Sequence, residues 1–288
     1  MQIDYALILG AGLGTRMGEI GKVIPKILWP VYFKTMLELQ VKYCEDLGIK
    51  NIYLNTHFLN SEIQDFLVKN KLDERIKVLN EEILLDSGGA IHNFAIRPEV
   101  NYQGTLLLIN ADQFLFFDKK YWNEAIAKVE SSRAVLFGIK VEKSSAYNEI
   151  VLEDNILKEI RANTEKRADY ITYSGLGILS LKNLKPIPGI SRFFETVVDY
   201  KNEKVEVVTP KECEYWDFGT AIIYANNTFK LKKENERESE MGKFLTKHLA
   251  FVGNEEKYIN TKSQSIDLDA KGVFRQGHIH AKDIYQKI

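Results

Sequence analysis

The chain has 288 residues, of which 45% are hydrophobic and 27% are charged. A chain of this length and hydrophobicity can bury a sizeable core, which excludes an intrinsically disordered protein. The 39 Lys and Arg residues nearly balance the 40 Asp and Glu residues, for a net charge of −1. Proteins that bind nucleic acid or anionic membranes generally carry a basic excess, so neither is expected as a partner.

The cysteine content and the apolar runs bear on the compartment. Cys44 and Cys213 cannot form a disulfide framework, which favours a reducing environment. The N-terminal apolar run is short and has no basic region before it, unlike a signal peptide. No apolar stretch approaches the about 20 residues that span a bilayer. The sequence therefore predicts a cytoplasmic protein.

Strand-like apolar runs alternate with amphipathic segments in the first half of the chain. The continuous run Tyr5–Leu9 predicts a central parallel strand, and a glycine-rich turn follows it. Thr35 and Glu38 have capping-box spacing at the start of a helix that Gly48 can end. Further strands are predicted at 51–55, 76–80, 104–109 and 133–141, with helices from 61 and around 120–130. This order predicts an α/β fold with a Rossmann-like, doubly wound, mixed but mainly parallel sheet.

The second half of the chain has a different pattern. Residues 146–180 predict short strands, which we expect to form a small antiparallel addition over the main sheet. A helix near 191–201 and a strand near 204–208 follow. Residues 1–225 are expected to form one domain, and residues 226–288 a helical or irregular extension packed on it. His278 and His280 are expected on a surface strand, because two histidines alone make a weak metal site.

The turn after the first strand has the composition of an anion site. Its glycines permit positive φ and close approach of a ligand, so that backbone N–H groups can surround a phosphate. It is neither a dinucleotide fingerprint, because Thr15 occupies the sixth position of G-x-G-x-x-G, nor a P-loop, because no Gly-Lys pair precedes Ser or Thr. Arg16 ends the turn, and Lys26 follows between two prolines that stiffen the backbone. Two cations beside a glycine turn favour a polyphosphate site.

Two aspartates are candidate metal ligands. Asp112 comes directly after a buried strand, where α/β sheets place ligands, although a turn-forming role is the alternative. Asp217 precedes Gly219 and Thr220, so its alternative role is to cap the following helix. Carboxylate and phosphate oxygens are the ligands that Mg²⁺ prefers.

Several short motifs occur together. The run L-G-A-G-L-G-T-R-M is followed, after a short spacer, by P-K-I-L-W-P-V, and L-D-S-G-G-A-I, N-A-D and W-D-F-G-T occur at 85–91, 110–112 and 216–220. This combination resembles the sugar-1-phosphate nucleotidyltransferases, with members such as N-acetylmuramate-1-phosphate uridylyltransferase and the mannose- and heptose-1-phosphate guanylyltransferases. The resemblance covers about residues 3–225 and departs in the spacer, where Glu19-Ile20-Gly21 replaces Pro-Leu-Thr.

The resemblance implies that residues 1–225 form a nucleotidyltransferase domain of EC 2.7.7 type. Such an enzyme joins an NTP, here UTP or GTP, to a sugar-1-phosphate, giving an NDP-sugar and pyrophosphate with Mg²⁺ as cofactor. Arg16 and Lys26 would be catalytic, and Asp112 and Asp217 would hold the metal. Residues implied to bind the nucleotide are Leu9, Ala11, Gly12, Leu13, Gly14, Thr15, Gly88 and Asp112.

Substrate selection is less defined by the motifs. Gly175, Glu159 and Arg161 are the candidates for binding the sugar phosphate, and Glu81 or Glu82 for recognising the nucleobase. Two alternatives stay open: a non-catalytic nucleotide or nucleotide-sugar sensor, and a cytidylyltransferase for a non-sugar phosphate such as phosphocholine. The protein is expected to be a monomer or a homodimer.

Overall fold

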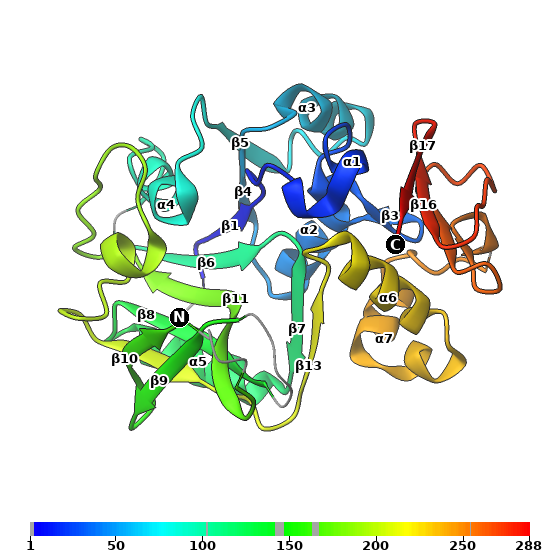
Figure 1. Cartoon of the computed structure of the whole chain (residues 1–288). Coiled ribbons are helices and arrows are strands. Elements are labelled where there is room, and N and C mark those ends of the chain that lie inside the picture. Colours follow the sequence, from blue (N-terminus) through cyan, green and yellow to red (C-terminus); the bar gives the residue numbers. More distant parts are fainter. Residues whose placement is uncertain (1–2, 102, 142–146, 163–166, 254) are drawn as a thin grey trace.

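The computed structural model describes residues 3–101, 103–141, 147–162, 167–253 and 255–288. Nine strands form one sheet in the order β5-β4-β1-β6-β11-β8-β12-β10-β9 (Figure 1). Their bounds are β1 Tyr5–Leu9, β4 Asn51–Thr56, β5 Ile76–Asn80, β6 Thr105–Asn110, β8 Ala134–Val141, β9 Glu149–Glu153, β10 Ile156–Arg161, β11 Tyr170–Ser180 and β12 Val205–Val208. The helices are α1 Gly18–Gly21, α2 Met36–Asp46, α3 Asn60–Lys69, α4 Asp86–Ala95, α5 Lys119–Val129, α6 Ala221–Leu231 and α7 Glu240–Lys247.

The sheet separates two buried clusters. Along β1, Ala6 and Ile8 face one cluster while Tyr5 and Leu7 face the other, as the period of a strand requires. The first cluster contains apolar side chains of α2, α3, α5, α6 and α7, and the second contains those of α4. Since both faces of the sheet are covered, its central strands are hydrophobic throughout. The predicted α/β, doubly wound fold is therefore confirmed.

Several predicted elements occur where the sequence placed them. β1 has the predicted bounds and pairs in parallel with β4 and β6. Thr35 and Glu38 form the capping box at the start of α2. β11 and β10 run against the other strands of the sheet, which is thus mixed with most strands parallel.

Other expectations were wrong. The antiparallel strands belong to the main sheet instead of lying over it, and β11 is inserted between β6 and β8. The helix expected near 191–201 is present but shorter, as the π-helix Phe193–Val197. Conversely, α4 forms in a segment with two glycines, because its apolar face packs under the sheet.

Two small sheets lie outside the nine-stranded one. One pairs β7 (Gln113–Phe117) with β13 (Cys213–Asp217), and the other pairs β2 (Pro30–Val31) with β3 (Lys34–Thr35).

The C-terminal part contains more strand than expected. After α7 come β14 (Ile259–Asn260), β15 (Ser265–Asp267), β16 (His278–Ala281) and β17 (Ile284–Lys287), which form a four-stranded sheet. Residue 225 lies inside α6, and Ile279 and Ala281 share a buried cluster with Ile8. A 3₁₀ turn at Glu234–Glu238 separates α6 from α7. None of the helices in the described ranges is long and apolar enough to cross a membrane.

Candidate active site

A cavity of about 470 Å³ lies at the carboxyl ends of β1, β4 and β6. This is the edge of an α/β sheet at which ligands bind. A second cavity of about 510 Å³ shares four lining residues with it, so the two adjoin. The first cavity is lined by Leu9, Ala11, Gly12, Arg16, Lys26, Asn55, Glu81, Leu84, Asp86, Ser87, Asn110, Asp112 and Ile190.

The glycine turn forms one wall of the first cavity. A Cβ at Gly12 would meet nothing within 4 Å, so the backbone there faces open space. Gly14 has a φ of +66° and precedes the 3₁₀ turn Thr15–Met17, a conformation that favours glycine. The N–H of Gly10 donates to Oδ1 of Asn55 at 2.8 Å, which ties the turn to the end of β4. The turn thus presents backbone and the Arg16 side chain to the cavity.

Lys26 is joined to Asp112 across 86 positions of sequence. Lys26 begins a short 3₁₀ turn after Pro25, and the next residue, Ile27, is buried in the core. The Lys26 ammonium donates to Oδ2 of Asp112, and both side chains are largely buried. A fixed positive charge therefore lies at the carboxyl end of β6, beside the glycine turn.

Asp112 and Asp217 lie side by side around Gly219. A Cβ on Gly219 would lie 2.8 Å from Oδ1 of Asp217 and 3.0 Å from Oδ2 of Asp112, so any larger residue would push between the carboxylates. The N–H of Phe218 also donates to the carbonyl of Asp112 at 2.8 Å. Burial and the negative charge of Asp112 raise the pKa of Asp217. Such a pair suits a divalent cation, which would neutralise both charges.

The position of Asp217 excludes its alternative role. Thr220 is the N-cap of α6, since its hydroxyl accepts from the N–H of Ile223 at 3.2 Å. Oδ1 of Asp217 instead accepts from the N–H of Gly219 at 2.7 Å, and Oδ2 accepts from the hydroxyl of Tyr147. These bonds hold the carboxylate in one orientation beside Asp112.

Glu81 forms part of the cavity wall and of a buried network. Its Oε1 accepts from Asn55 at 2.8 Å, and its Oε2 accepts from the N–H of Leu85 at 3.1 Å. Burial raises the pKa of this carboxyl group. Since Asn55 also binds Gly10, the network fixes the glycine turn relative to the start of α4. Its neighbour Glu82 is exposed and does not line the cavity.

Not every nucleotide candidate lines the cavity. Leu13, Gly14 and Thr15 belong to the turn but not to the cavity wall. Gly88 is buried: a Cβ there would lie 2.6 Å from the carbonyl oxygen of Ser191, so close packing of α4 on that backbone explains the glycine. The neighbouring Ser87 lines the cavity in its place.

The sugar-phosphate candidates are not brought to the cavities. Glu159 and Arg161 bind each other at 2.6 Å on the exposed side of β10, while Ile160 between them lines the second cavity. Alternate residues of a strand point to opposite faces, which places both charges away from that cavity. Gly175, with a φ of +83°, packs under the side-chain amide of Gln113 and lines neither cavity.

Several residues of the site escaped the sequence analysis. Asn55 and Asn110 lie near or at the ends of β4 and β6, and both line the first cavity. Their position after buried strands was a usable signal, the same one that singled out Asp112. Tyr147 carried no such signal, because it reaches Asp217 only through the tertiary fold.

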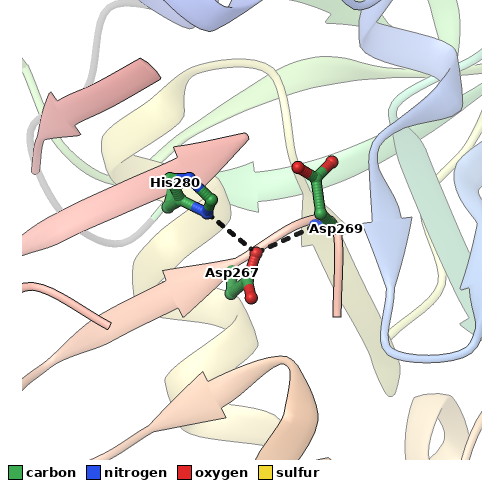
Figure 2. A group of neighbouring side chains, drawn as sticks. All are labelled: Asp267, Asp269 and His280. Carbon is green, nitrogen blue, oxygen red and sulfur yellow. Dashed lines mark hydrogen bonds and ion pairs between the residues drawn. The ribbon is translucent and has the colours of Figure 1, made fainter. Parts of the chain in front are cut away.

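A second cluster of possible metal ligands lies in the C-terminal sheet. Figure 2 shows Asp267, Asp269 and His280, whose ligand atoms all lie within 4.8 Å of one another. His280 is buried, contrary to its expected place on a surface strand, and its Nδ1 donates to Oδ1 of Asp267 at 3.1 Å. The same oxygen accepts from the N–H of Asp269, and Oδ2 accepts from those of Lys271 and Val273. The Asp267 carboxylate is thus used to anchor a loop.

Similar proteins share parts of this chain. It is 28% identical over 149 residues to a bifunctional sugar-1-phosphate nucleotidylyltransferase/acetyltransferase of Sulfurisphaera tokodaii, covering 52% of this chain and 34% of that protein. It is 37% identical over 86 residues to a D-glycero-alpha-D-manno-heptose 1-phosphate guanylyltransferase of Campylobacter jejuni, covering 30% of this chain and 39% of that protein. The matches thus span well under two thirds of the length of these relatives.

Comparison of folds gives a wider match. The crystal structure of HddC from Yersinia pseudotuberculosis, complexed with GMP-PN, has a TM-score of 0.67 at 24% identity, covering 80% of this chain and 100% of that chain. UDP-glucose pyrophosphorylase complexed with UDP-glucose has a TM-score of 0.63 at 19% identity, covering 81% of this chain and 100% of that chain. The family model for nucleotidyl transferases matches residues 5–177, more than half of the sequence. The chain belongs to the nucleotidyl transferase family.

Proposed function

We propose that this chain is a magnesium-dependent nucleotidyltransferase that joins an NTP to a sugar-1-phosphate, giving an NDP-sugar and pyrophosphate. The observation that carries the proposal is the convergence of Lys26, Asp112 and Asp217 beside the glycine turn, from three distant parts of the chain. A nucleotide sensor has no need of paired carboxylates beside a lysine, whereas phosphoryl-group transfer depends on such charges.

The reaction brings two anions together, so charge neutralisation is the main task of the site. An oxygen of the sugar phosphate attacks the α-phosphorus of the NTP, and the bond from that phosphorus to the pyrophosphate oxygen breaks. We assign the β- and γ-phosphates to the glycine turn, whose Ala11 and Gly12 line the first cavity, and the charge on the departing pyrophosphate to Arg16. We assign Lys26, which lines the first cavity, to the reacting phosphorus, where its charge would lower the repulsion between the reactants.

The carboxylates of Asp112 and Asp217 fit a magnesium ion. Asp112 lines the first cavity and Asp217 lies beside it, so one oxygen from each would bind a Mg²⁺ ion whose coordination phosphates and water complete. Bound there, the ion would withdraw negative charge from the phosphate oxygens of both reactants. Tyr147 and the Gly219 N–H keep Asp217 in the orientation that this role needs. The Lys26 ammonium compensates part of the charge on Asp112.

The nucleobase is proposed to be guanine, with UTP as the competing substrate. The Glu81 carboxylate lines the first cavity, and a carboxylate accepts hydrogen bonds from the N–H groups of guanine. Two relatives are named guanylyltransferases of heptose or mannose 1-phosphate, and HddC was crystallised with GMP-PN. The uracil base of UTP has a single N–H donor, so it would donate at most one hydrogen bond to the carboxylate of Glu81.

The second cavity is the proposed acceptor site, and its lining favours a second candidate function. The rings of Tyr173, Phe194 and Tyr200 line it beside Arg192. Aromatic faces bind the C–H faces of sugars and also quaternary ammonium groups. The chain is 31% identical over 111 residues to a choline-phosphate cytidylyltransferase of Streptococcus pneumoniae, covering 38% of this chain and 45% of that protein. Phosphocholine is therefore the alternative acceptor.

A pyrophosphate-release screen tests the proposal. Each of the four NTPs is combined with a panel of sugar-1-phosphates and with phosphocholine, with and without Mg²⁺. Release with GTP and a sugar-1-phosphate, dependent on Mg²⁺, is the expected result. Release only with CTP and phosphocholine would mean that the acceptor is phosphocholine and not a sugar-1-phosphate. No release with any pair would favour a sensor.

A further inference from the structure

The C-terminal sheet reaches the helical turn that follows Arg16. β17 contacts α1, and both elements are labelled in Figure 1. The main-chain N–H of Ile20 donates to Oε1 of Gln286 at 3.1 Å. Gln286 packs directly on Gly18, where a Cβ would overlap the glutamine side-chain amide. The φ of +71° at position 18 favours glycine, and a Cβ there would force the flexible end of Gln286 to shift.

Gln286 supplies a helix cap that the local sequence lacks. The first N–H groups of a helix have no partner within the helix, and Met17, which precedes α1, makes no side-chain cap. Oε1 of Gln286 satisfies one of these groups from 266 positions away. At the other end of this segment, Nζ of Lys282 donates to the carbonyl of Val23 at 3.1 Å. The β16–β17 hairpin therefore holds residues 18–23 at two points.

The hairpin is itself fixed to the core. Ile279 and Ala281 of β16 are fully buried in the cluster that contains Met17 and Ile20. Asp267 binds His280 and the loop between β15 and β16 (Figure 2). A support anchored in this way can define the position of the segment that it contacts at Ile20 and Val23.

We propose that Gln286 is a positioning residue for the phosphate-binding turn. Asn55 fixes the start of the turn through Gly10, and Gln286 fixes the segment directly after Arg16. The inference rests on the proposed function, because the bound group is taken to be the β- and γ-phosphates or pyrophosphate. It assigns the C-terminal sheet, which lies outside the matched family region, a role in binding the NTP.

The test compares three variants of the full chain. Gln286→Met removes the acceptor oxygen at similar length, Gln286→Glu retains an oxygen, and Gln276→Met makes the same chemical change at an exposed position nearby. Binding of inorganic pyrophosphate is measured by calorimetry, KM by pyrophosphate release, and exchange of the Ile20 amide by hydrogen–deuterium exchange. The unfolding midpoint is measured for each variant.

Gln286→Met is expected to weaken pyrophosphate binding and to raise KM for the NTP by roughly two- to tenfold, the range of one hydrogen bond. It should also speed exchange at Ile20, while KM for the acceptor and the unfolding midpoint stay unchanged. Gln286→Glu, which retains the acceptor oxygen, should keep the slow exchange of the Ile20 amide, and Gln276→Met should behave as wild type. Wild-type pyrophosphate binding by Gln286→Met, or equal losses for both substrates, would overturn the inference. A third outcome separates the two ideas. If wild type transfers no nucleotide but binds pyrophosphate more tightly than Gln286→Met does, the proposed function is contradicted and the role of Gln286 is not.

Discussion

The ammonium of Lys26 donates to the carboxylate of Asp112, which joins the segment after the glycine turn to the end of the central strand β6. Lys26→Ala is expected to lower kcat by roughly 10²–10³-fold, because a preorganised charge at the reacting phosphate is lost. The unfolding midpoint should change little, since the side chain is partly exposed to the cavity.

Lys22→Ala is the matched control for this prediction. Lys22 lies on the same segment, but its side chain is exposed and forms an ion pair with Glu19. Steady-state kinetics and thermal unfolding of both variants provide the measurement. A folded Lys26→Ala variant with wild-type turnover would remove this lysine from the catalytic site.

Asp217→Asn is expected to lower kcat strongly and to weaken Mg²⁺ binding, because an amide is a poorer ligand than a carboxylate for a hard cation. Activity is measured against Mg²⁺ concentration, which should show a raised requirement for metal. Asp118→Asn, at the exposed N-cap of α5, is a control that should leave the metal requirement unchanged. An unaltered Mg²⁺ dependence in Asp217→Asn would exclude Asp217 as a ligand.

Gly12 and Gly88 are expected to respond to alanine in different ways. Gly12→Ala should leave the fold intact, because no atom lies within 4 Å of the new Cβ, but should raise KM for the NTP by filling the turn. Gly88→Ala should lower the free energy of unfolding by about 1–3 kcal/mol, since the Cβ would overlap the backbone at Ser191. Thermal unfolding and KM for the NTP, measured for both variants, distinguish the effect on stability from the effect on NTP binding. Equal destabilisation of the two variants would contradict it.

Glu81→Gln tests recognition of the nucleobase. The amide retains one acceptor oxygen and loses the charge, so kcat/KM for GTP should fall roughly tenfold while other NTPs are affected less. Glu82→Gln, at the exposed neighbour, is the control and should behave as wild type. An equal loss for all four NTPs would mean that Glu81 acts only through its bonds to Asn55 and Leu85.

The lowered pKa of Glu206 predicts how the stability of the fold depends on pH. Burial alone would raise its pKa, but hydrogen bonds from Lys128, Lys204 and Ser132 lower it from 4.5 to about 2. A depressed carboxyl pKa stabilises the fold at pH values above the unfolded pKa, and this contribution is lost as the pH falls from 4.5 toward 2. Because the lysines are partly exposed, the contribution is expected to be about 1–2 kcal/mol.

Urea unfolding of Glu206→Gln across pH measures this contribution. The variant should be less stable than wild type at neutral pH, and the difference should shrink below pH 4.5, the ordinary pKa of the group. Glu203→Gln, at a more exposed acid on the adjacent loop, should show a smaller difference. A difference for Glu206→Gln that stays constant with pH would contradict the assignment.

The sequence alone determined the elements whose signals are local. β1 and the capping box of α2 were predictable because hydrophobic periodicity and cap residues lie within a few positions of each other. The glycine turn and its cations were recognisable for the same reason. The order of strands and helices was enough to define the fold class, since both faces of a parallel sheet must be covered.

Only the tertiary structure decided which distant residues meet. The face of β10 that carries Glu159 and Arg161 depends on which side of that strand packs against the protein, and the strand is too weakly patterned to specify it. Asp112 and Asp217 become neighbours because Phe218 binds the backbone of Asp112, and Gln286 reaches Ile20 through a sheet that was not predicted. Contacts between residues far apart in sequence follow from packing of whole elements, and no local pattern records them.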